Sequence, residues 1–247
     1  TLLNGRLEFV AGLVDPGDYL NVYALIDPWT DFNDLTFSTG ATIPLPFQGL
    51  GAAVYGLLSE KIYVLAGITD ANGDPTDPLG IFKSFFSTAE YFSHIEMGWI
   101  ESSEKSYTDN IHITFWHVSE KKAAGTPEGS GLAFSFCRTF ADHWIPFLRG
   151  GFTNDGGALL EGSIIGGLGY YFPSSTDQLS VGFGWGKPSK STFGENLRDQ
   201  VTMELYYRLR LLKALSITPD IQFIINPALN PDKNFMTVFG IRLRASI

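Results

Sequence analysis

Charged side chains recur at every second position of short apolar runs, and these are the residues whose types could do chemistry. Near the C-terminus, Glu204 and Arg208 alternate with Leu205 and Leu209. Guanidinium groups donate hydrogen bonds, carboxylates accept them, and hydroxyl groups do both, so such a row suits a polyhydroxylated solute. The alternative is that these charges pair across strands and only keep the surface wet. The full polar row comprises Arg6, Glu8, Glu96, Arg149, Glu204, Arg208, Arg210, Asp220, Arg242 and Arg244.

Aromatic residues beside carboxamides form a second candidate group, because sugar rings stack on aromatic faces while polar groups hold their edges. The candidates are Trp29, Phe32 and Asn33 in a long loop, and Trp116 in a predicted strand. The loop also carries Asp27, Asp31 and Asp34, which would form a zwitterionic constriction if they faced Arg149 or Arg208. The alternative is a surface loop with Trp29 packed on its rim.

Catalytic and metal-binding patterns are weak in this sequence. The four histidines lack the spacing of a metal site. No Gly-x-Ser-x-Gly nucleophile motif occurs. The glycine-rich run at 182–186 falls in a predicted strand, which a phosphate-binding loop does not. The lone Cys137 is expected to be a small wall residue. We therefore expect no enzyme activity, no cofactor and no metal.

Strict alternation over about ten residues predicts β-strands, because successive strand side chains point to opposite faces. About twelve strands are expected, at 5–14, 50–58, 62–69, 91–100, 111–118, 131–138, 144–152, 162–172, 178–186, 199–212, 216–226 and 237–247. Their connections alternate between short and long, and the strand lengths suit a tilted bilayer crossing, as in transmembrane barrels. The loop at 15–48 is long enough to fold into a pore. Aromatic residues near strand ends, among them Tyr63, Trp99 and Trp144, are expected to form interfacial girdles.

Composition agrees with a single all-β domain spanning residues 1–247. Only 17% of the residues are charged, while 14% are aromatic and 27 are glycine. The net charge of −9 disfavours nucleic acid as a partner. No run approaches the roughly 20 apolar residues of a transmembrane helix.

Several motifs resemble one family along the whole chain. They are GLVDPGDYLN, DFNDLTFST, YVLAGITDANGDP, FWHVSE, IPFLRGGF and, most distinctively, SITPDIQFIINPALNP followed by TVFGIRLRASI. These stretches are similar to the carbohydrate-selective porins of Gram-negative bacteria, the OprB family. The resemblance implies a passive outer-membrane channel for mono- or oligosaccharides, surrounded by lipid or detergent, as a monomer or homotrimer. Family barrels typically have sixteen strands, so the chain resembles the C-terminal two-thirds of one. Either upstream strands are absent or the barrel closes with fewer.

Two further interpretations remain open at this stage. The chain could be a soluble or surface-attached β-sheet protein that binds carbohydrate, with its polar face in bulk water. It could also be an outer-membrane barrel enzyme. In the barrel interpretation, Leu205, Tyr207, Leu209, Ile241 and Leu243 meet lipid, and the last strand pairs with the strand that begins near Gly5.

Overall fold

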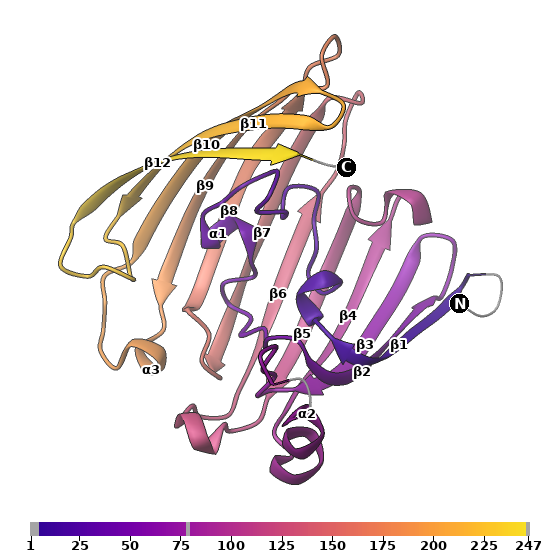
Figure 1. Ribbon diagram of the computed structural model, residues 1–247, viewed down its shortest axis with the longest axis vertical. Helices are drawn as coiled ribbons and strands as arrows, with labels where there is room; N and C mark the ends of the chain where they lie inside the picture. Colours follow the sequence, from indigo (N-terminus) through magenta and orange to yellow (C-terminus); the bar gives the residue numbers. More distant parts are fainter. Residues whose placement is uncertain (1–4, 78–79, 246–247) are drawn as a thin grey trace.

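Twelve antiparallel strands form one curved sheet in sequence order in the computed structural model, which describes residues 5–77 and 80–245 (Figure 1). Each strand pairs with its neighbours in the chain, as hairpin connections dictate. The predicted all-β antiparallel fold and the strand number are therefore confirmed. The strands are β1 (Leu7–Val14), β2 (Gly49–Leu57), β3 (Ile62–Asp70), β4 (Tyr91–Ile100), β5 (Asn110–Val118), β6 (Gly129–Cys137), β7 (Trp144–Asp155), β8 (Leu160–Tyr171), β9 (Gln178–Pro188), β10 (Gln200–Leu212), β11 (Leu215–Ile225) and β12 (Phe235–Ala245).

Connections differ between the two ends of the sheet. At one end, here called the short-turn end, they span 58–61, 101–109, 138–143, 172–177 and 213–214. At the opposite end they span 15–48, 71–90, 119–128, 156–159, 189–199 and 226–234. The 156–159 turn is the one short member of that second set. Such segregation is typical of outer-membrane barrels, whose periplasmic turns are short.

The helices are short and lie in these connections. They are α1 (Leu35–Ser38), α2 (Gly80–Lys83), α3 (Lys190–Phe193), a π-helix (Ser84–Thr88) and 3-10 helices at Pro16–Asp18, Ser103–Lys105 and Lys122–Ala124. None of the helices in the described part of the chain is long and apolar enough to cross a membrane.

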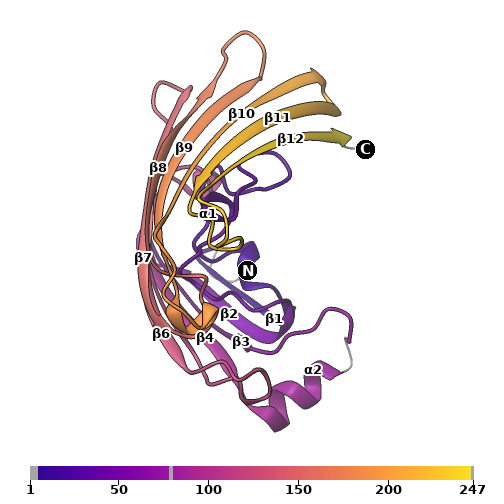
Figure 2. The same ribbon diagram turned by 90° about the vertical axis from the view of Figure 1, so that its left-hand side faces the viewer.

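The two margins of the sheet, β1 and β12, do not pair with each other among the described residues. The expectation that the last strand pairs with the strand beginning near Gly5 is therefore wrong. Figure 2 shows the sheet as an open trough with residues 15–48 on its concave side.

Side-chain orientation along the strands follows the predicted alternation. In β10, Glu204 and Arg208 are buried on the concave face, whereas Leu205 and Leu209 are exposed on the convex face. In β12, Ile241 and Leu243 are more than two-thirds exposed. Large apolar residues are exposed on the convex side of every strand except β6, where they are half-buried, and a surface of that extent suits a lipid environment.

Aromatic residues gather on the convex side near the short-turn end. Trp144 packs on Tyr170 with ring centroids 4.4 Å apart, and the Arg138 guanidinium lies 4.8 Å from the Trp99 ring. Amphipathic rings beside cations are typical of membrane interfaces. Tyr63 departs from the predicted girdle, because its strand parity turns it to the concave face, where it is buried.

The hydrophobic core lies between the sheet and residues 15–48. One cluster joins Leu20 and Ile43 to Phe92 and Trp116. A second joins Phe32 and Phe37 to Phe147, Tyr206 and Cys137. Each buried aromatic ring stabilises this arrangement by roughly 2–3 kcal/mol.

Glycines in β9 admit the segment to close contact with the sheet. A Cβ at Gly182 would lie 2.8 Å from the Phe37 ring, and one at Gly184 would lie 2.9 Å from the Thr36 methyl group. The glycine-rich run of β9 therefore serves packing.

Candidate functional site

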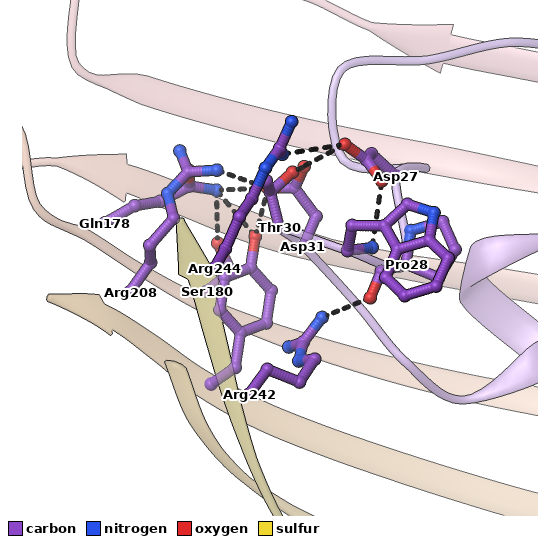
Figure 3. A network of polar contacts seen from close by, with 11 residues as sticks. Asp27, Pro28, Thr30, Asp31, Gln178, Ser180, Arg208, Arg242 and Arg244 are labelled. Carbon is purple, nitrogen blue, oxygen red and sulfur yellow. Dashed lines mark hydrogen bonds and ion pairs between the residues drawn. The ribbon is translucent and has the colours of Figure 1, made fainter. Parts of the chain in front are cut away.

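Residues 15–48, here called the inner segment, cross the concave face and contact inward-pointing polar side chains of the sheet. Two groups of contacts hold them. The first, the Asn21 anchor, consists of Asn21, Tyr63, Glu96, Thr114 and Arg149. The second, the Asp31 network, consists of Asp27, Asp31, Gln178, Tyr206, Arg208, Arg242 and Arg244 (Figure 3).

Glu96 is the acceptor at the centre of the Asn21 anchor. Its Oε2 accepts hydrogen bonds from the Asn21 backbone N–H at 2.9 Å and from Thr114 Oγ1 at 2.6 Å. Its Oε1 accepts one from the Tyr63 hydroxyl at 2.7 Å. The carboxylate is buried, and these bonds replace the water that it has lost.

Arg149 completes the anchor from β7. Its Nη2 donates to the Asn21 carbonyl at 2.8 Å and also contacts the Asn21 side-chain oxygen, while its Nη1 donates to the Phe37 carbonyl at 3.2 Å. The guanidinium also lies 4.2 Å from the centre of the Tyr23 ring. Asn21 has a positive φ of 55°, a conformation that asparagine tolerates better than most residues. The chain thus presents both its N–H and its C=O to the wall at this residue.

Glu204 of β10 binds the backbone in the middle of the inner segment. Its two carboxylate oxygens accept hydrogen bonds from the backbone N–H groups of Asn33 at 2.7 Å and Asp34 at 2.8 Å. Asp34 in turn accepts from the Thr36 N–H at 2.8 Å, which starts helix α1. Glu204 therefore holds the segment just before its only α-helix among the described residues.

Asp31 is buried and joins the segment to β9 and β10. Its Oδ1 accepts hydrogen bonds from the Tyr206 hydroxyl at 2.7 Å and Gln178 Nε2 at 3.1 Å, and it lies 3.6 Å from Arg208 Nη1. Asp31 thus lies beside Arg208, one of the two arginines expected to face the loop carboxylates, and whether these charges form a constriction stays a prediction. Burial raises the pKa of the Asp31 carboxyl above its ordinary value, while the Arg208 guanidinium opposes that rise.

Two arginines of β12 reach the same part of the inner segment. Arg242 Nη1 donates to the Pro28 carbonyl at 2.6 Å, and Arg244 Nη1 lies 3.5 Å from Asp27 Oδ2. Arg242 Nε also lies 3.9 Å from the buried carboxylate of Asp220. Because β12 has a sheet partner on one side only, these contacts are its second attachment to the rest of the molecule.

The remaining predicted site residues fall into two groups. Trp29, Asn33, Arg6 and Glu8 are exposed, and Glu8 stands opposite Tyr55 on the concave face. Phe32 and Trp116 are buried instead. Phe32 packs on Phe37, Phe147 and Tyr206, and Trp116 stacks on Phe92 with centroids 6.3 Å apart. The structure gives these two rings a packing role and leaves no open face for a sugar.

Sequence reasoning missed several polar members of the site. Asn21, Gln178 and Tyr206 each make two or more of its hydrogen bonds. Gln178 and Tyr206 share strand parity with Ser180 and Arg208, so the alternation pattern was a usable signal for both. Asn21 had no such signal, because it lies in an irregular connection.

A pocket opens beside the Asn21 anchor, between β1 and the 3-10 helix at Ser103–Lys105. It has a volume of about 310 Å³ and is lined by Glu8, Tyr55, Tyr63 and Ser106, among others. That volume is near the lower end of the range for small-ligand sites. The rings of Tyr55 and Tyr63 stack 5.3 Å apart at 28° and form one wall. The arrangement offers an aromatic surface beside carboxylate and hydroxyl groups.

Metal-ligating side chains do not gather in groups of three anywhere within residues 5–77 and 80–245. Cys137 is a buried free thiol. The hydrogen bonds and ion pairs of the site hold the inner segment against the sheet.

The half of the sheet from β7 to β12 has a sequence that matches a known protein family. Residues 139–246 match the carbohydrate-selective porin, OprB family. The matched region begins in the turn before β7 and reaches β12, so it includes Arg149, Glu204 and Arg208 but not the inner segment. The resemblance to this porin family is confirmed.

Two solved structures of OprB from Pseudomonas putida share the fold. The high-pH structure is 14% identical, with 99% of this chain and 70% of that chain covered and a TM-score of 0.72. The low-pH structure is 15% identical, with 99% and 64% covered and a TM-score of 0.59. At such identities the likeness shows the porin fold. No curated protein matches the chain.

Proposed function

We propose that the protein forms part or all of an outer-membrane channel wall through which small carbohydrates diffuse passively. Solutes pass along the concave face, where the inner segment narrows the path. The protein resides in the outer membrane of a Gram-negative cell, with lipid against its convex face, as a monomer or homotrimer. The proposal includes no catalytic step and no energy coupling.

The observation that carries this proposal is the attachment of the inner segment to the wall from two sides. Glu96 and Arg149 hold Asn21, whereas Glu204 and Arg208 hold residues 31–34. A segment fixed in this way keeps a constant aperture, which passive selection by solute size requires. The OprB match over residues 139–246 supports carbohydrate as the solute class.

Weak contacts along the path supply the finer selectivity. Glu8 and Tyr55 line the 310 Å³ pocket, and Trp29 is 75% exposed. Exposed carboxylates and aromatic rings bind sugars through contacts that are easily exchanged with water, and transport needs such release.

Liposome swelling tests the proposal. Detergent-purified protein is reconstituted into liposomes, which are then diluted into iso-osmotic arabinose, glucose or maltose. We expect swelling with each sugar at rates that fall as the sugar grows, without any energy source. Swelling no faster than in protein-free liposomes would contradict the proposal, and protein that stays soluble without detergent would favour the soluble carbohydrate-binding alternative. Release of a hydrolysed sugar would favour the enzyme alternative.

A further inference from the structure

A second pocket lies at the short-turn end of the concave face, around the β10–β11 turn at 213–214. Its volume is about 200 Å³, and it is bounded by Thr30 of the inner segment and by residues of β10, β11 and β12. Its charged lining residues are Arg208, Arg210, Lys213 and Arg244, which are all cations, and no lining residue is acidic. The chain as a whole has a net charge of −9, so this concentration of positive charge is a local feature.

Strand register places two of these cations on either side of a small residue. Arg210 of β10 pairs with Ser216 of β11, and Ser216 pairs with Arg244 of β12. Neighbouring strands are about 4.8 Å apart, so the two arginine backbones are separated by about 10 Å. The short Ser216 side chain leaves the space between them open and adds a hydroxyl group to its floor.

Two of the four cations already have partners. Arg208 contacts Asp31 and Gln178, and Arg244 pairs with Asp27. The side chains of Arg210 and Lys213 make no hydrogen bond or ion pair with any residue that the structure describes, and Arg210 contacts Asp177 only through its backbone N–H, which donates to Asp177 Oδ1 at 2.8 Å. The Arg208 Nε is buried and also lacks a described partner. Donors in excess of acceptors, two of them free, favour an anion as the missing partner.

We propose that this pocket binds the oxyanion group, carboxylate or phosphate, of a small solute such as an acidic or phosphorylated monosaccharide. Arg210 and Lys213 provide the free donors, and Arg208 and Arg244 line the pocket beside them while they remain paired with Asp31 and Asp27. The volume suits one anionic group rather than a whole oligosaccharide. That the anion is carried by a sugar rests on the proposed function, whereas oxyanion binding rests on the pocket alone.

Isothermal titration calorimetry on the full chain in a non-ionic detergent at pH 7 tests the proposal. The probes are glucose 6-phosphate, glucuronate, inorganic phosphate and glucose. We expect at least one of the anionic probes to bind and glucose to bind far more weakly. Affinity should fall when salt is raised from about 0.05 M to about 0.5 M, because the donors are solvent-accessible. Comparison of glucose 6-phosphate with glucuronate tells which oxyanion the pocket prefers. Comparison of glucose 6-phosphate with inorganic phosphate tells whether the sugar contributes to the affinity.

A matched pair of double variants locates the site. Arg210→Gln with Lys213→Gln should weaken binding of the anionic probe by about tenfold or more, since two charge-assisted hydrogen bonds are lost. Lys121→Gln with Lys122→Gln changes the net charge by the same amount in the β5–β6 connection, at the other end of the sheet, and should leave affinity within about twofold. The exchange of Arg210→Lys with Lys213→Arg keeps the charge and should retain binding.

Two results would overturn the proposal. One is the absence of heat with all three anionic probes at millimolar concentration. The other is equal weakening by the two glutamine pairs, which would assign binding to overall charge. Glucose-driven liposome swelling by the Arg210→Gln, Lys213→Gln protein is measured in parallel. If the wild type causes no swelling, the proposed channel function is contradicted. The oxyanion-binding proposal is then still judged by the calorimetry alone.

Discussion

The inner segment is held on two sides, and the contacts on the two sides differ in burial and in the groups that they join. At the Asn21 anchor, Glu96 and Arg149 are buried and bind the segment mainly through its backbone. At the Asp31 network, most contacts join two side chains, apart from the bond of Arg242 to the Pro28 carbonyl, and the outermost pair, Arg244 with Asp27, is about half exposed. Buried bonds to backbone are insensitive to salt, whereas exposed ion pairs are screened. We infer that both sides position the segment and that the Asn21 side contributes more to its stability than the Asp31 network does.

Removal of the Arg149 guanidinium is expected to have the largest effect. In Arg149→Met, the buried carbonyls of Asn21 and Phe37 lose their donor, so the free energy of unfolding should fall by about 3 kcal/mol or more. Urea unfolding in detergent, followed by tryptophan fluorescence, measures the loss. The control Arg6→Met removes one exposed contact and should change stability by less than about 0.5 kcal/mol. Equal losses of stability in the two variants would contradict the special role of the buried Arg149.

Glu96→Gln and Glu8→Gln compare two glutamates of the same concave wall. Glutamine in place of Glu96 keeps one acceptor oxygen but presents an amide to a site with three donors, so we expect a loss of about 1–2 kcal/mol. Glu8 is exposed, and its substitution should be nearly neutral for stability while altering the sugar dependence of liposome swelling. The same urea titration serves both variants. A destabilised Glu8→Gln protein would contradict the assignment of these roles.

The fold and its faces were largely accessible from the sequence, because alternation is a local signal. The opposite orientations of Leu205 and Arg208 follow from a period of two. The attachment points were harder to predict. Glu204 binds backbone N–H groups of residues 33 and 34, and a backbone donor carries no residue-type signal. The sequence predicts sugar contact for Phe32 because sugar rings stack on aromatic faces, yet in the structure Phe32 packs against the wall. The open margin at β12 was missed because pairing between distant strands has no local signature.

Asp31 gives the Asp31 network a pH dependence of its own. Burial raises the folded-state pKa of this carboxyl above its unfolded value of roughly 3.9. A raised pKa in an acid means that the folded state binds the proton more tightly, so the stability contribution is complete below the unfolded pKa and declines as pH rises through the folded pKa. Asp31→Asn removes this decline. We expect the urea midpoint of the wild type to fall relative to that of Asp31→Asn between pH 4 and pH 7.

Parallel midpoints at every pH would show that Asp31 does not titrate differently in the folded state. Glu8→Gln is a suitable control, because it removes an exposed carboxyl from the other side of the trough.

The exposed pair is expected to have the smallest effect. Arg244→Gln breaks the contact with Asp27 and should cost no more than about 0.5 kcal/mol at low salt. The difference from the wild type should disappear at about 1 M salt, where screening is strong. Urea titrations at the two salt concentrations measure it. A loss above about 2 kcal/mol that persists at high salt would contradict the smaller contribution of this side to stability.

Single-channel conductance in planar bilayers tests the central claim, that attachment from both sides sets the aperture. The comparison is between the wild type, Glu96→Gln, Glu204→Gln and the double variant, because each glutamate holds backbone N–H groups of the inner segment. The account predicts conductance that is steady in the wild type, raised and more variable in each single variant, and highest in the double variant. Folded double-variant protein with the conductance of the wild type would contradict it.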